Sequence, residues 1–250
     1  MKGETMRTKL MAGPAMICAL LLSAAPAAAA QSPCTDLGGN LQSGDVCHAQ
    51  DITSEYMIDF RFAVGHPEDG AVAAFLAKER DRVIGLARAP GAAKLPYSLW
   101  VTSVSTRSGQ PQRTTLGYNN NAIPNTPQTG TRSLLLKVLA DIETAPSNST
   151  YKSFVFDFDQ RRPVTLENLF AAGVNPVDVL SPVVAADLAR QFHVRGFAVS
   201  DGIRDPATYR SFTITDDAVT FYIDQSAVLP ARVGGLISVV PRSKIPPLQI

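Results

Sequence analysis

The sequence predicts an α+β fold, with mixed or antiparallel sheets and helices packed against them. Several segments alternate apolar and polar side chains, which is typical of half-buried strands. Two longer segments repeat apolar residues with the helical period instead. Strands and helices do not alternate strictly along the chain, so a doubly wound parallel sheet is disfavoured.

Residues 1–30 have the layout of a secretory signal peptide. A basic start is followed by an apolar stretch, Leu10–Ala25, and by the small residues Ala28–Ala30. The apolar stretch is shorter than the about 20 residues that cross a bilayer, so we expect cleavage after Ala30 and not a retained membrane anchor. We therefore expect a secreted, extracellular protein, free or associated with the cell wall, with no membrane span after cleavage.

The charge balance excludes two classes of partner. The leader carries three of the 23 basic residues and one of the 22 acidic residues, which leaves 20 and 21, a net charge of about −1. A nucleic-acid binder or a polybasic membrane binder would show a clustered surplus of Lys and Arg, and the sequence has none. We expect no nucleic-acid partner and no cofactor, and we expect a monomer.

Two cysteines remain after the leader, Cys34 and Cys47, and in an exported chain they predict a disulfide. Closing a loop of this size stabilises a fold by roughly 3 kcal/mol in the chain-entropy model. His48 follows Cys47 directly, but zinc needs three or four ligands and no further spaced Cys or His joins them. We therefore expect no metal site.

The first strands and helix follow in order along the chain. Tyr56–Val64 alternates cleanly and predicts a half-buried strand, and an apolar stripe that begins near Asp69 predicts a helix. Tyr97–Thr106 is predicted to be a second strand, and Arg132–Glu143 a third that is apolar on both faces and therefore central. Residues 107–131 are rich in Gly, Pro, Asn, Gln and Thr, which favours a long mobile loop.

The second half of the chain again predicts strands and a helix. Tyr151–Asp159 predicts a strand, and Thr165 is positioned to cap a short helical turn after it. Val177–Phe192 predicts a helix in which Pro182 lies in the first turn or kinks the axis. Leu236–Pro241 predicts the last strand before an exposed tail. The side of the helix expected to face the core holds Val179, Val183, Ala186 and Phe192.

Asp216 and Asp217 stand between two apolar alternating runs, which raises the question of a catalytic carboxylate pair. General acid–base chemistry needs carboxylates in a cleft with perturbed environments. Here the alternation on both sides predicts a hairpin whose tight turn lies near Asp216–Ala218, and Asp is a preferred turn residue because its side chain bonds local amides. We interpret the two acids as turn residues.

Several motifs resemble those of the secreted mycobacterial immunogenic protein family of culture-filtrate antigens. They are "CTDLGGNLQSGDVC", "YKSFVFDFDQRRPVTLENLF" and "YRSFTITDDAVTFYIDQSAVLPARVGG". They also resemble the extracytoplasmic part of lysozyme-sensing anti-sigma factors. The resemblance implies a secreted protein without established catalytic residues, with residues 31–150 as an α+β subdomain and residues 151–250 as a β-grasp-like one. The loop 107–131 is longer than in the family, and Ala218 replaces a usual Gly.

Three functional hypotheses follow. The first is a non-catalytic binding protein for a host or cell-envelope partner, because no catalytic signature is present. The second is a secreted serine esterase or hydrolase. It lacks the usual nucleophile elbow G-x-S-x-G, and its base must be His48, His66 or His193. The third, recognition of lysozyme or peptidoglycan, rests on the anti-sigma resemblance alone.

Overall fold

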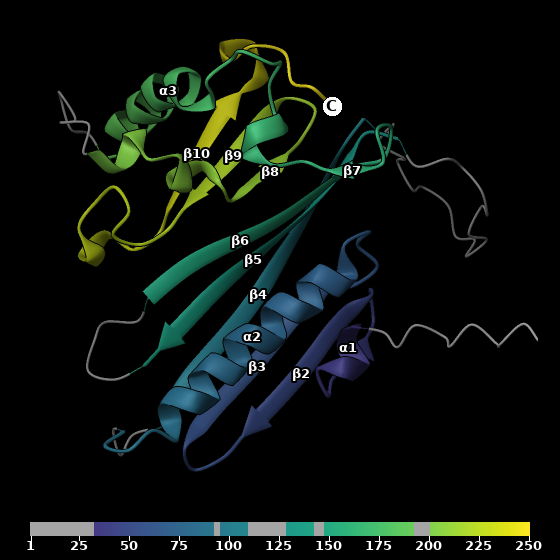
Figure 1. The fold of residues 1–250 in the computed structure, drawn as a ribbon, viewed down its shortest axis with the longest axis vertical. Helices are drawn as coiled ribbons and strands as arrows, with labels where there is room; N and C mark the ends of the chain where they lie inside the picture. The colour runs from purple at the N-terminus through teal and green to yellow at the C-terminus, as the bar shows by residue number, and fades with distance from the viewer. Residues whose placement is uncertain (1–32, 93–95, 110–128, 143–147, 193–200) are drawn as a thin grey trace, which may run out of the picture. The chain divides into compact units, whose positions relative to one another are not determined.

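The computed structural model describes residues 33–92, 96–109, 129–142, 148–192 and 201–250 (Figure 1). The expected signal peptide, most of the expected loop 107–131 and His193 lie outside the described residues. Residues 31–250 form one compact unit.

A seven-stranded mixed sheet contains the strands in chain order (Figure 1). Its strands are β1 (Asn40–Gln42), β2 (Val46–Ile52), β3 (Tyr56–Ala63), β4 (Tyr97–Ser108), β5 (Thr131–Asp141), β6 (Asn148–Asp157) and β7 (Arg162–Pro163). Neighbouring strands are antiparallel except β3 and β4, which are parallel and joined through helix α2 (Asp69–Ala87). The expected α+β class is confirmed, and β5 is central as predicted. The short strand β1 and most of β2 carry no strong alternation in the sequence, so neither strand was predicted.

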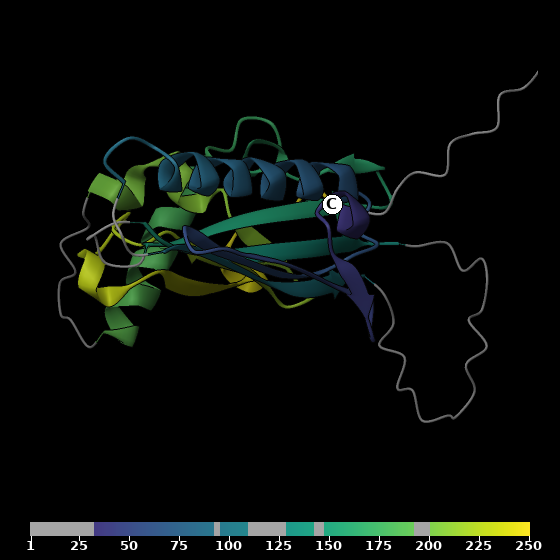
Figure 2. The ribbon, with the colours of Figure 1, turned by 90° about the horizontal axis from the view of Figure 1, so that it is seen from below.

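Helix α2 lies along one face of this sheet (Figure 2). The alternation of β3 is confirmed, because its inward side chains are buried against α2 while those between them are not. The core under α2 is built from the inward residues of β2 to β6, among them Ile58, Phe60, Phe62, Leu76, Leu99 and Leu136.

A disulfide fastens the N-terminal end of the described chain to the sheet. It joins Cys34 in the short helix α1 (Pro33–Asp36) to Cys47 on β2, as predicted. Gly39 lies so close to it that a Cβ atom there would stand 2.8 Å from the Cys47 Sγ and 2.9 Å from the Cys34 Sγ. The bridge and this glycine therefore fit together only because Gly39 has no side chain.

A second, three-stranded antiparallel sheet has the order β10-β9-β8. Its strands are β8 (Phe212–Ile214), β9 (Ala218–Ile223) and β10 (Leu236–Pro241). Helix α3 (Pro176–Gln191) packs on it around a second core that includes Leu180, Val184, Leu188, Tyr209, Phe212 and Phe221. Short 3-10 helices complete the chain at Leu166–Asn168, Asp201–Arg204, Pro206–Tyr209, Ala231–Val233 and Arg242–Lys244.

Adjacent residues of β6 belong to different cores. Phe154 is buried in the core under α2, and Val155 is buried in the core of the small sheet. Residue 151, where the sequence analysis divides the chain, lies inside this strand. The seven-stranded sheet thus supplies one face to each core.

Side-chain hydroxyls attach the edge of the small sheet to the face of the large one. The Ser133 Oγ accepts from the Ile214 N–H at 3.1 Å, and the Thr106 Oγ1 donates to the Ile214 carbonyl at 3.2 Å. The Ser153 Oγ accepts from the Phe212 N–H at 3.0 Å. Three outward backbone groups of the edge strand β8, the two N–H groups and the Ile214 carbonyl, are thereby bonded without another strand.

The opposite edge, β10, is covered by α3. Asp187 is buried, and its Oδ2 accepts from the Ser238 hydroxyl at 2.8 Å and from the Val239 N–H at 3.3 Å. The Gln191 side-chain amide donates to the Ile237 carbonyl at 3.0 Å. The last turns of α3 therefore protect this edge from pairing with another chain.

The hairpin interpretation of the two adjacent acids is confirmed. Asp216 and Asp217 are exposed at the turn between β8 and β9. The Asp216 Oδ1 accepts from the Gly109 N–H at 2.7 Å, and the Asp217 carbonyl accepts from the Arg242 N–H at 2.8 Å. Apart from glycines, the described residues with positive φ are Asp45, Arg161 and Ser226, so Ala218 needs no left-handed conformation.

The expected exposed tail is wrong. Ile245 and Leu248 are buried in the second core, and Leu248 forms a β-bridge with Phe170. The Gln249 N–H also donates to the Leu169 carbonyl at 2.9 Å. Apolar residues spaced among prolines do not show a helical or strand period, so their burial was not visible in the pattern.

The expected buried side of α3 is correct in part, because Val179 and Val183 are partly buried against the second core, but it is wrong for Ala186 and Phe192. The buried stripe contains Leu180, Val184 and Leu188, whereas Ala186 and Phe192 are exposed. Pro182 lies inside the helix beyond its first turn, and Pro176 occupies the start. Asp187, a polar residue, also faces inward, where it accepts from the Ser238 hydroxyl of β10.

Candidate functional site

The face of the large sheet that α2 does not cover is partly exposed over β2, β3 and β4. We call this surface the open sheet face. Its outward side chains are His48, Gln50, Ile52, Met57, Asp59, Arg61, Trp100, Thr102 and Val104. The exposed fraction is 56% for Ile52, 36% for Trp100 and 52% for Val104.

Asp59 is the centre of the polar part of this face. Its side chain is only 13% exposed. Arg61 contacts both carboxylate oxygens, from Nε to Oδ1 at 3.3 Å and from Nη2 to Oδ2 at 3.4 Å. The Gln50 side-chain amide donates to Oδ2 at 3.3 Å. The carboxylate is therefore held in place by groups from two strands.

His48 is the fourth member of this group. It lies directly across from Arg61 in the β2–β3 register, and its Nε2 stands 3.3 Å from the Asp59 Oδ1. The Nε2 is buried, and its contact with Asp59 is a charge contact without hydrogen-bond alignment. The Gln42 amide on β1 lies 3.2 Å from Nδ1. Both ring nitrogens of His48 therefore have a polar neighbour, the Gln42 side chain at Nδ1 and the Asp59 carboxylate at Nε2.

Apolar side chains adjoin this polar group. Trp100 is the register partner of Asp59 on one side and of Leu139 on the other. Met57 and Ile52 are paired across β2 and β3 in the next row. Side chains in register on one face of a sheet are in contact range. The open sheet face thus combines an aromatic and aliphatic strip with a fixed set of charged groups.

His66 does not lie on this face and cannot act as a free base. It is buried, its Nδ1 accepts from the Glu68 N–H at 3.2 Å, and its Nε2 contacts the Arg132 carbonyl at 3.1 Å. Both ring nitrogens are thus used by the backbone. Burial lowers the pKa of His66 below its usual value, although the Arg132 carbonyl opposes this effect. Its role is to fasten the start of α2 to β5.

The three histidines named by the sequence are not brought together. His48 lies on the open sheet face beside β1, His66 lies before α2 and contacts β5, and His193 lies outside the described residues. Within the described ranges, no histidine is hydrogen-bonded to a serine. The serine–histidine arrangement of a usual esterase is therefore not found in the part of the chain that the structure describes.

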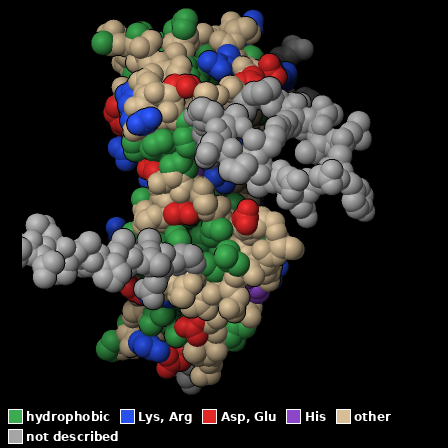
Figure 3. Space-filling view, turned by 90° about the vertical axis from the view of Figure 1, so that its right-hand side faces the viewer, with side chains coloured by type: hydrophobic (Ala, Val, Ile, Leu, Met, Phe, Trp, Pro, Cys, Tyr) green, Lys and Arg blue, Asp and Glu red, His purple; other side chains and the backbone are tan. Residues whose placement is uncertain are grey.

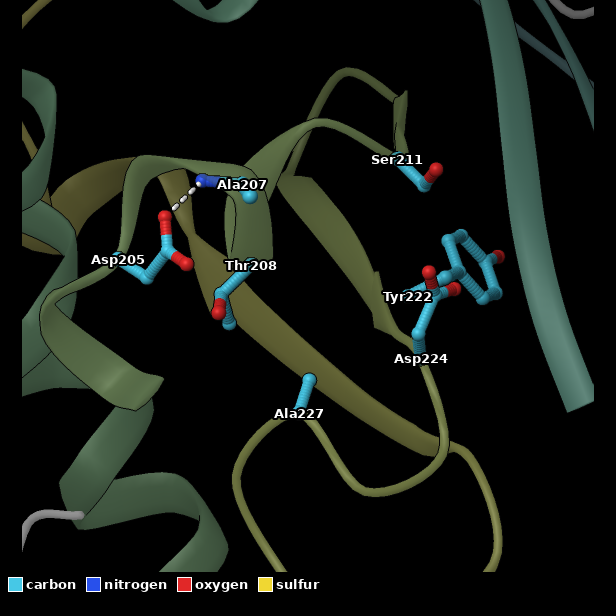
Figure 4. Close-up of a pocket in the computed structure, with 7 residues that line it drawn as sticks. All are labelled: Asp205, Ala207, Thr208, Ser211, Tyr222, Asp224 and Ala227. Atoms are coloured by element: carbon cyan, nitrogen blue, oxygen red, sulfur yellow. Dashed lines mark hydrogen bonds between the residues drawn. The ribbon is translucent and has the colours of Figure 1, made fainter. Parts of the chain in front are cut away.

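A small cavity of about 130 Å³ lies at the end of the small sheet (Figure 4). Asp205 and Thr208 stand on one side of it, and Ser211, Tyr222 and Asp224 on the other. Its lining residues are Asp205, Ala207, Thr208, Ser211, Tyr222, Asp224 and Ala227.

The polar groups of this cavity are used mainly for structure. The Ser211 hydroxyl donates to the Tyr151 carbonyl at 2.8 Å, and the Asp224 Oδ1 accepts from the Tyr151 N–H at 2.7 Å. The Thr208 hydroxyl donates to the Gly202 carbonyl at 2.6 Å. Burial raises the pKa of Asp224, while its bond from the Tyr151 backbone opposes this. Ser211 is therefore not a free nucleophile.

Other classes of site find no support in the described part of the chain. No group of three or more potential metal ligands occurs among these residues. None of their helices is long and apolar enough to cross a bilayer. Acidic and basic side chains are interspersed on the side of the molecule seen in Figure 3. The exposed apolar side chains and the charged group around Asp59 make the open sheet face our candidate site.

The sequence pattern singles out His48 but not its neighbours on the sheet. Asp59 and Arg61 were visible as the outward residues of a predicted strand, but their proximity to His48 depends on β2, which was not predicted. The signal was the outward spacing of His48, Gln50 and Ile52. It was hidden because the same seven residues carry Cys47 and Ala49, which are weak indicators of a strand.

Comparisons with known proteins place the chain among relatives of two kinds. The family model described as "Protein of unknown function (DUF3298)" matches residues 167–243. Esterase Rv3036c of Mycobacterium tuberculosis is 35% identical over 236 residues, which cover 94% of this chain and 97% of that protein. Immunogenic protein MPT64 of the same organism is 27% identical over 240 residues, which cover 96% and 98%.

A solved structure supports the fold. The crystal structure of a DUF3298 family member from Bacteroides fragilis aligns with a TM-score of 0.50 at 12% identity, and covers 80% of this chain and 90% of that one. At this identity the likeness concerns the fold alone. The expected similarity to immunogenic antigens is confirmed, whereas the similarity to anti-sigma factors stays a prediction.

Proposed function

Since this chain belongs to the family of Esterase Rv3036c of Mycobacterium tuberculosis, we propose that it is an exported protein that binds a host or cell-envelope partner through the open sheet face. Export is supported by the leader-like residues 1–30 and by the similarity to immunogenic proteins. Binding is supported by the exposed apolar side chains of the open sheet face and by the charged group around Asp59.

The observation that carries this proposal is the exposed apolar strip around Trp100. Scattered exposed apolar residues are ordinary, but contiguous ones rimmed by polar groups mark interaction sites. Trp100 adjoins Leu139 in register and has the polar group of Asp59 on its other side. Aromatic residues and Arg are enriched at binding surfaces, and both are present here.

The state of the sheet edges favours binding of a partner to a sheet face and not to a sheet edge. Both edges of the small sheet are capped by side chains, at β8 by Ser133 and Ser153 and at β10 by Asp187 and Gln191. The described edges of the large sheet are strands of three and two residues. A partner that added a strand would find little free backbone. A partner that contacts side chains finds the open sheet face.

Two named probes test this proposal. Purified peptidoglycan and lysozyme are incubated with the mature protein, with Trp100→Ala and with Ile237→Ala, an exposed apolar residue on the small sheet that serves as the control. We expect retention on one probe, lost with Trp100→Ala and kept with Ile237→Ala. Because Trp100 is the single tryptophan, its fluorescence should also change on binding. Equal retention of both variants contradicts the proposal.

Ester hydrolysis is the second candidate function. It is favoured by the relative named as an esterase, which is similar over nearly the whole chain. The fixed pair of His48 and Asp59 on an exposed apolar surface agrees with it. The test is release of p-nitrophenol from p-nitrophenyl butyrate by the purified mature protein. Absence of hydrolysis above a heat-denatured control removes this candidate and leaves binding untouched.

A further inference from the structure

We propose that the open sheet face binds an extended glycan strand that carries carboxylates on short side arms, which is the chemistry of the glycan strands of peptidoglycan. The inference rests on the proposed function, because it names the partner of the same surface. Two adjacent rows of outward side chains carry it. They cross the strands of the large sheet, one with Trp100 at its centre and one that includes Lys137.

The polar row crosses five strands of the large sheet. In register order from β2 to β6 it contains His48, Arg61, Thr102, Lys137 and Tyr151. Neighbouring strands lie about 4.8 Å apart, so the row is about 19 Å long. The step from strand to strand is close to the length of one sugar unit in an extended pyranose chain. A glycan laid along the row therefore meets a new side chain at each sugar.

Three members of the polar row have polar atoms left for a ligand. The Arg61 side chain is 57% exposed, and Asp59 uses its Nε and Nη2 but not its Nη1. Thr102 and Lys137 are exposed, and the side chain of neither has a hydrogen-bond or ion-pair partner within the described ranges. These groups supply an N–H donor, a hydroxyl and an ammonium, which suit a ligand rich in hydroxyl and carbonyl oxygens.

The apolar row lies beside the polar row. Its members are Gln50, Asp59, Trp100, Leu139 and Ser149. A sugar ring has an apolar C–H face that packs on an indole, while its hydroxyls point outward from the edge of the ring. Thr102 follows Trp100 by two residues on β4, about 7 Å along the strand. A ring on Trp100 therefore directs its edge oxygens toward the polar row.

Lys137 selects the charge of the ligand. Arg61 is paired with Asp59, so these two groups are neutral together, whereas Lys137 has no carboxylate partner in the described part of the chain. Trp100 and Lys137 are diagonal neighbours on β4 and β5, about 7 Å apart. A carboxylate on a side arm of the sugar spans this distance while the ring stays on the indole. Charge complementarity thus favours a carboxylated strand over a basic protein such as lysozyme.

The shape of the surface also favours a chain. The two rows span a strip of about 19 Å by 7 Å. A standard protein interface covers about 800 Å² on each partner, which is several times this area. At β6 the polar row ends at Tyr151, whose ring packs against Tyr222 of β9 with the centroids 5.6 Å apart. The small sheet therefore limits the strip at this end.

Isothermal titration calorimetry with two tetramers tests the inference. One is chitotetraose, a neutral β-1,4-linked amino-sugar chain. The other is (GlcNAc–MurNAc)2, which has the same chain and two lactyl carboxylates. The variants are Trp100→Ala, Lys137→Gln and, as the matched control, Lys78→Gln, which removes an exposed lysine of α2 on the other face of the sheet. Circular dichroism melting of each variant shows that it is folded.

The wild type should bind the carboxylated tetramer more tightly than chitotetraose. Trp100→Ala should weaken the binding of both tetramers about 10-fold or more, as the loss of a central tryptophan contact does. Lys137→Gln should weaken only the binding of the carboxylated tetramer, by about 5-fold at low salt, which corresponds to an exposed ion pair. Lys78→Gln should match the wild type with both tetramers.

Three results would overturn the inference. Equal affinity of the wild type for the two tetramers, or a preference that survives Lys137→Gln, would overturn the assignment of the carboxylate. A folded Trp100→Ala variant that binds both tetramers like the wild type would overturn the apolar row as the contact surface. Binding of neither tetramer, together with Trp100-dependent retention on lysozyme or intact peptidoglycan, would overturn the glycan strand as the partner and leave the proposed function standing. Absence of binding to every probe would overturn both.

Discussion

The hydroxyl of Ser133 on β5 accepts a hydrogen bond from the backbone N–H of Ile214 on β8, a residue 81 positions later and in the other sheet. Ser133 is fully buried, and so is Ile214. The Ser133 side chain thus satisfies one backbone amide of an edge strand that has no neighbouring strand on this side.

Replacing Ser133 by Ala is expected to lower the free energy of unfolding by about 1–3 kcal/mol, because the buried Ile214 N–H loses its partner. Urea denaturation measures the effect. The control is Ser105→Ala, at an exposed position of β4, which should change the free energy by less than about 0.5 kcal/mol. Equal effects at the two positions would show that the hydroxyl does not hold β8 in place.

Asp187 is expected to be the most sensitive polar residue of α3. Asp187→Ala removes the acceptor of the Ser238 hydroxyl and the Val239 N–H, and charged hydrogen bonds of this kind contribute about 1.5–3 kcal/mol each. We expect a loss of at least about 2 kcal/mol by chemical denaturation, from the same reasoning. Asp178→Ala, in the exposed first turn of α3, should cost less than about 1 kcal/mol. An Asp187→Ala variant as stable as the wild type would contradict the interpretation that Asp187 protects the β10 edge.

His66 is expected to make the protein less stable in acid. Its pKa is lower in the folded state than its ordinary value of 6.5, so the unfolded chain takes up the proton more readily. The contribution of neutral His66 to the free energy of unfolding is fully present above pH 6.5. It is lost as the pH falls from there toward the lowered pKa. His66→Gln should flatten the dependence of the unfolding free energy on pH between 7.5 and 5.5, in urea titrations at each pH. An unchanged slope would assign this dependence to other groups.

The two faces of the large sheet should respond differently to truncation. Trp100→Ala, on the open sheet face, should change stability by less than about 1 kcal/mol, because the ring is partly exposed. Leu136→Ala, on the face under α2, should cost about 2–5 kcal/mol because it leaves a cavity. Thermal or urea unfolding compares them. A large loss with Trp100→Ala would mean that the ring is part of the core and is not available to a partner.

Gly39 is expected to tolerate no side chain. Its Cβ would collide with both sulfurs of the disulfide, so Gly39→Ala should cost about 1–3 kcal/mol through overpacking. Gly70→Ala, early in α2, meets no atom within 4 Å and should be neutral or stabilising. The two variants differ by the same single methyl group. Similar unfolding midpoints for both would show that the backbone at Gly39 can move away from the bridge.

The sequence by itself determined the local elements of this protein. Alternation located the strand Tyr56–Val64, and the helical period located the helix beginning at Asp69, because side-chain periodicity reports which face of an element is apolar. The cysteine pair and the hairpin at Asp216 and Asp217 were also found, since disulfides and turns depend on residue types that are close in the chain.

Only the tertiary structure decided which elements meet. His48 and Asp59 contact each other because β2 pairs with β3, and the weak outward spacing in Val46–Ile52 was not enough to predict that strand. The tail around Leu248 is buried because it pairs with Phe170, far away in the chain. Such contacts depend on register and packing between distant segments, whereas the pattern of one segment records only how strongly that segment favours burial.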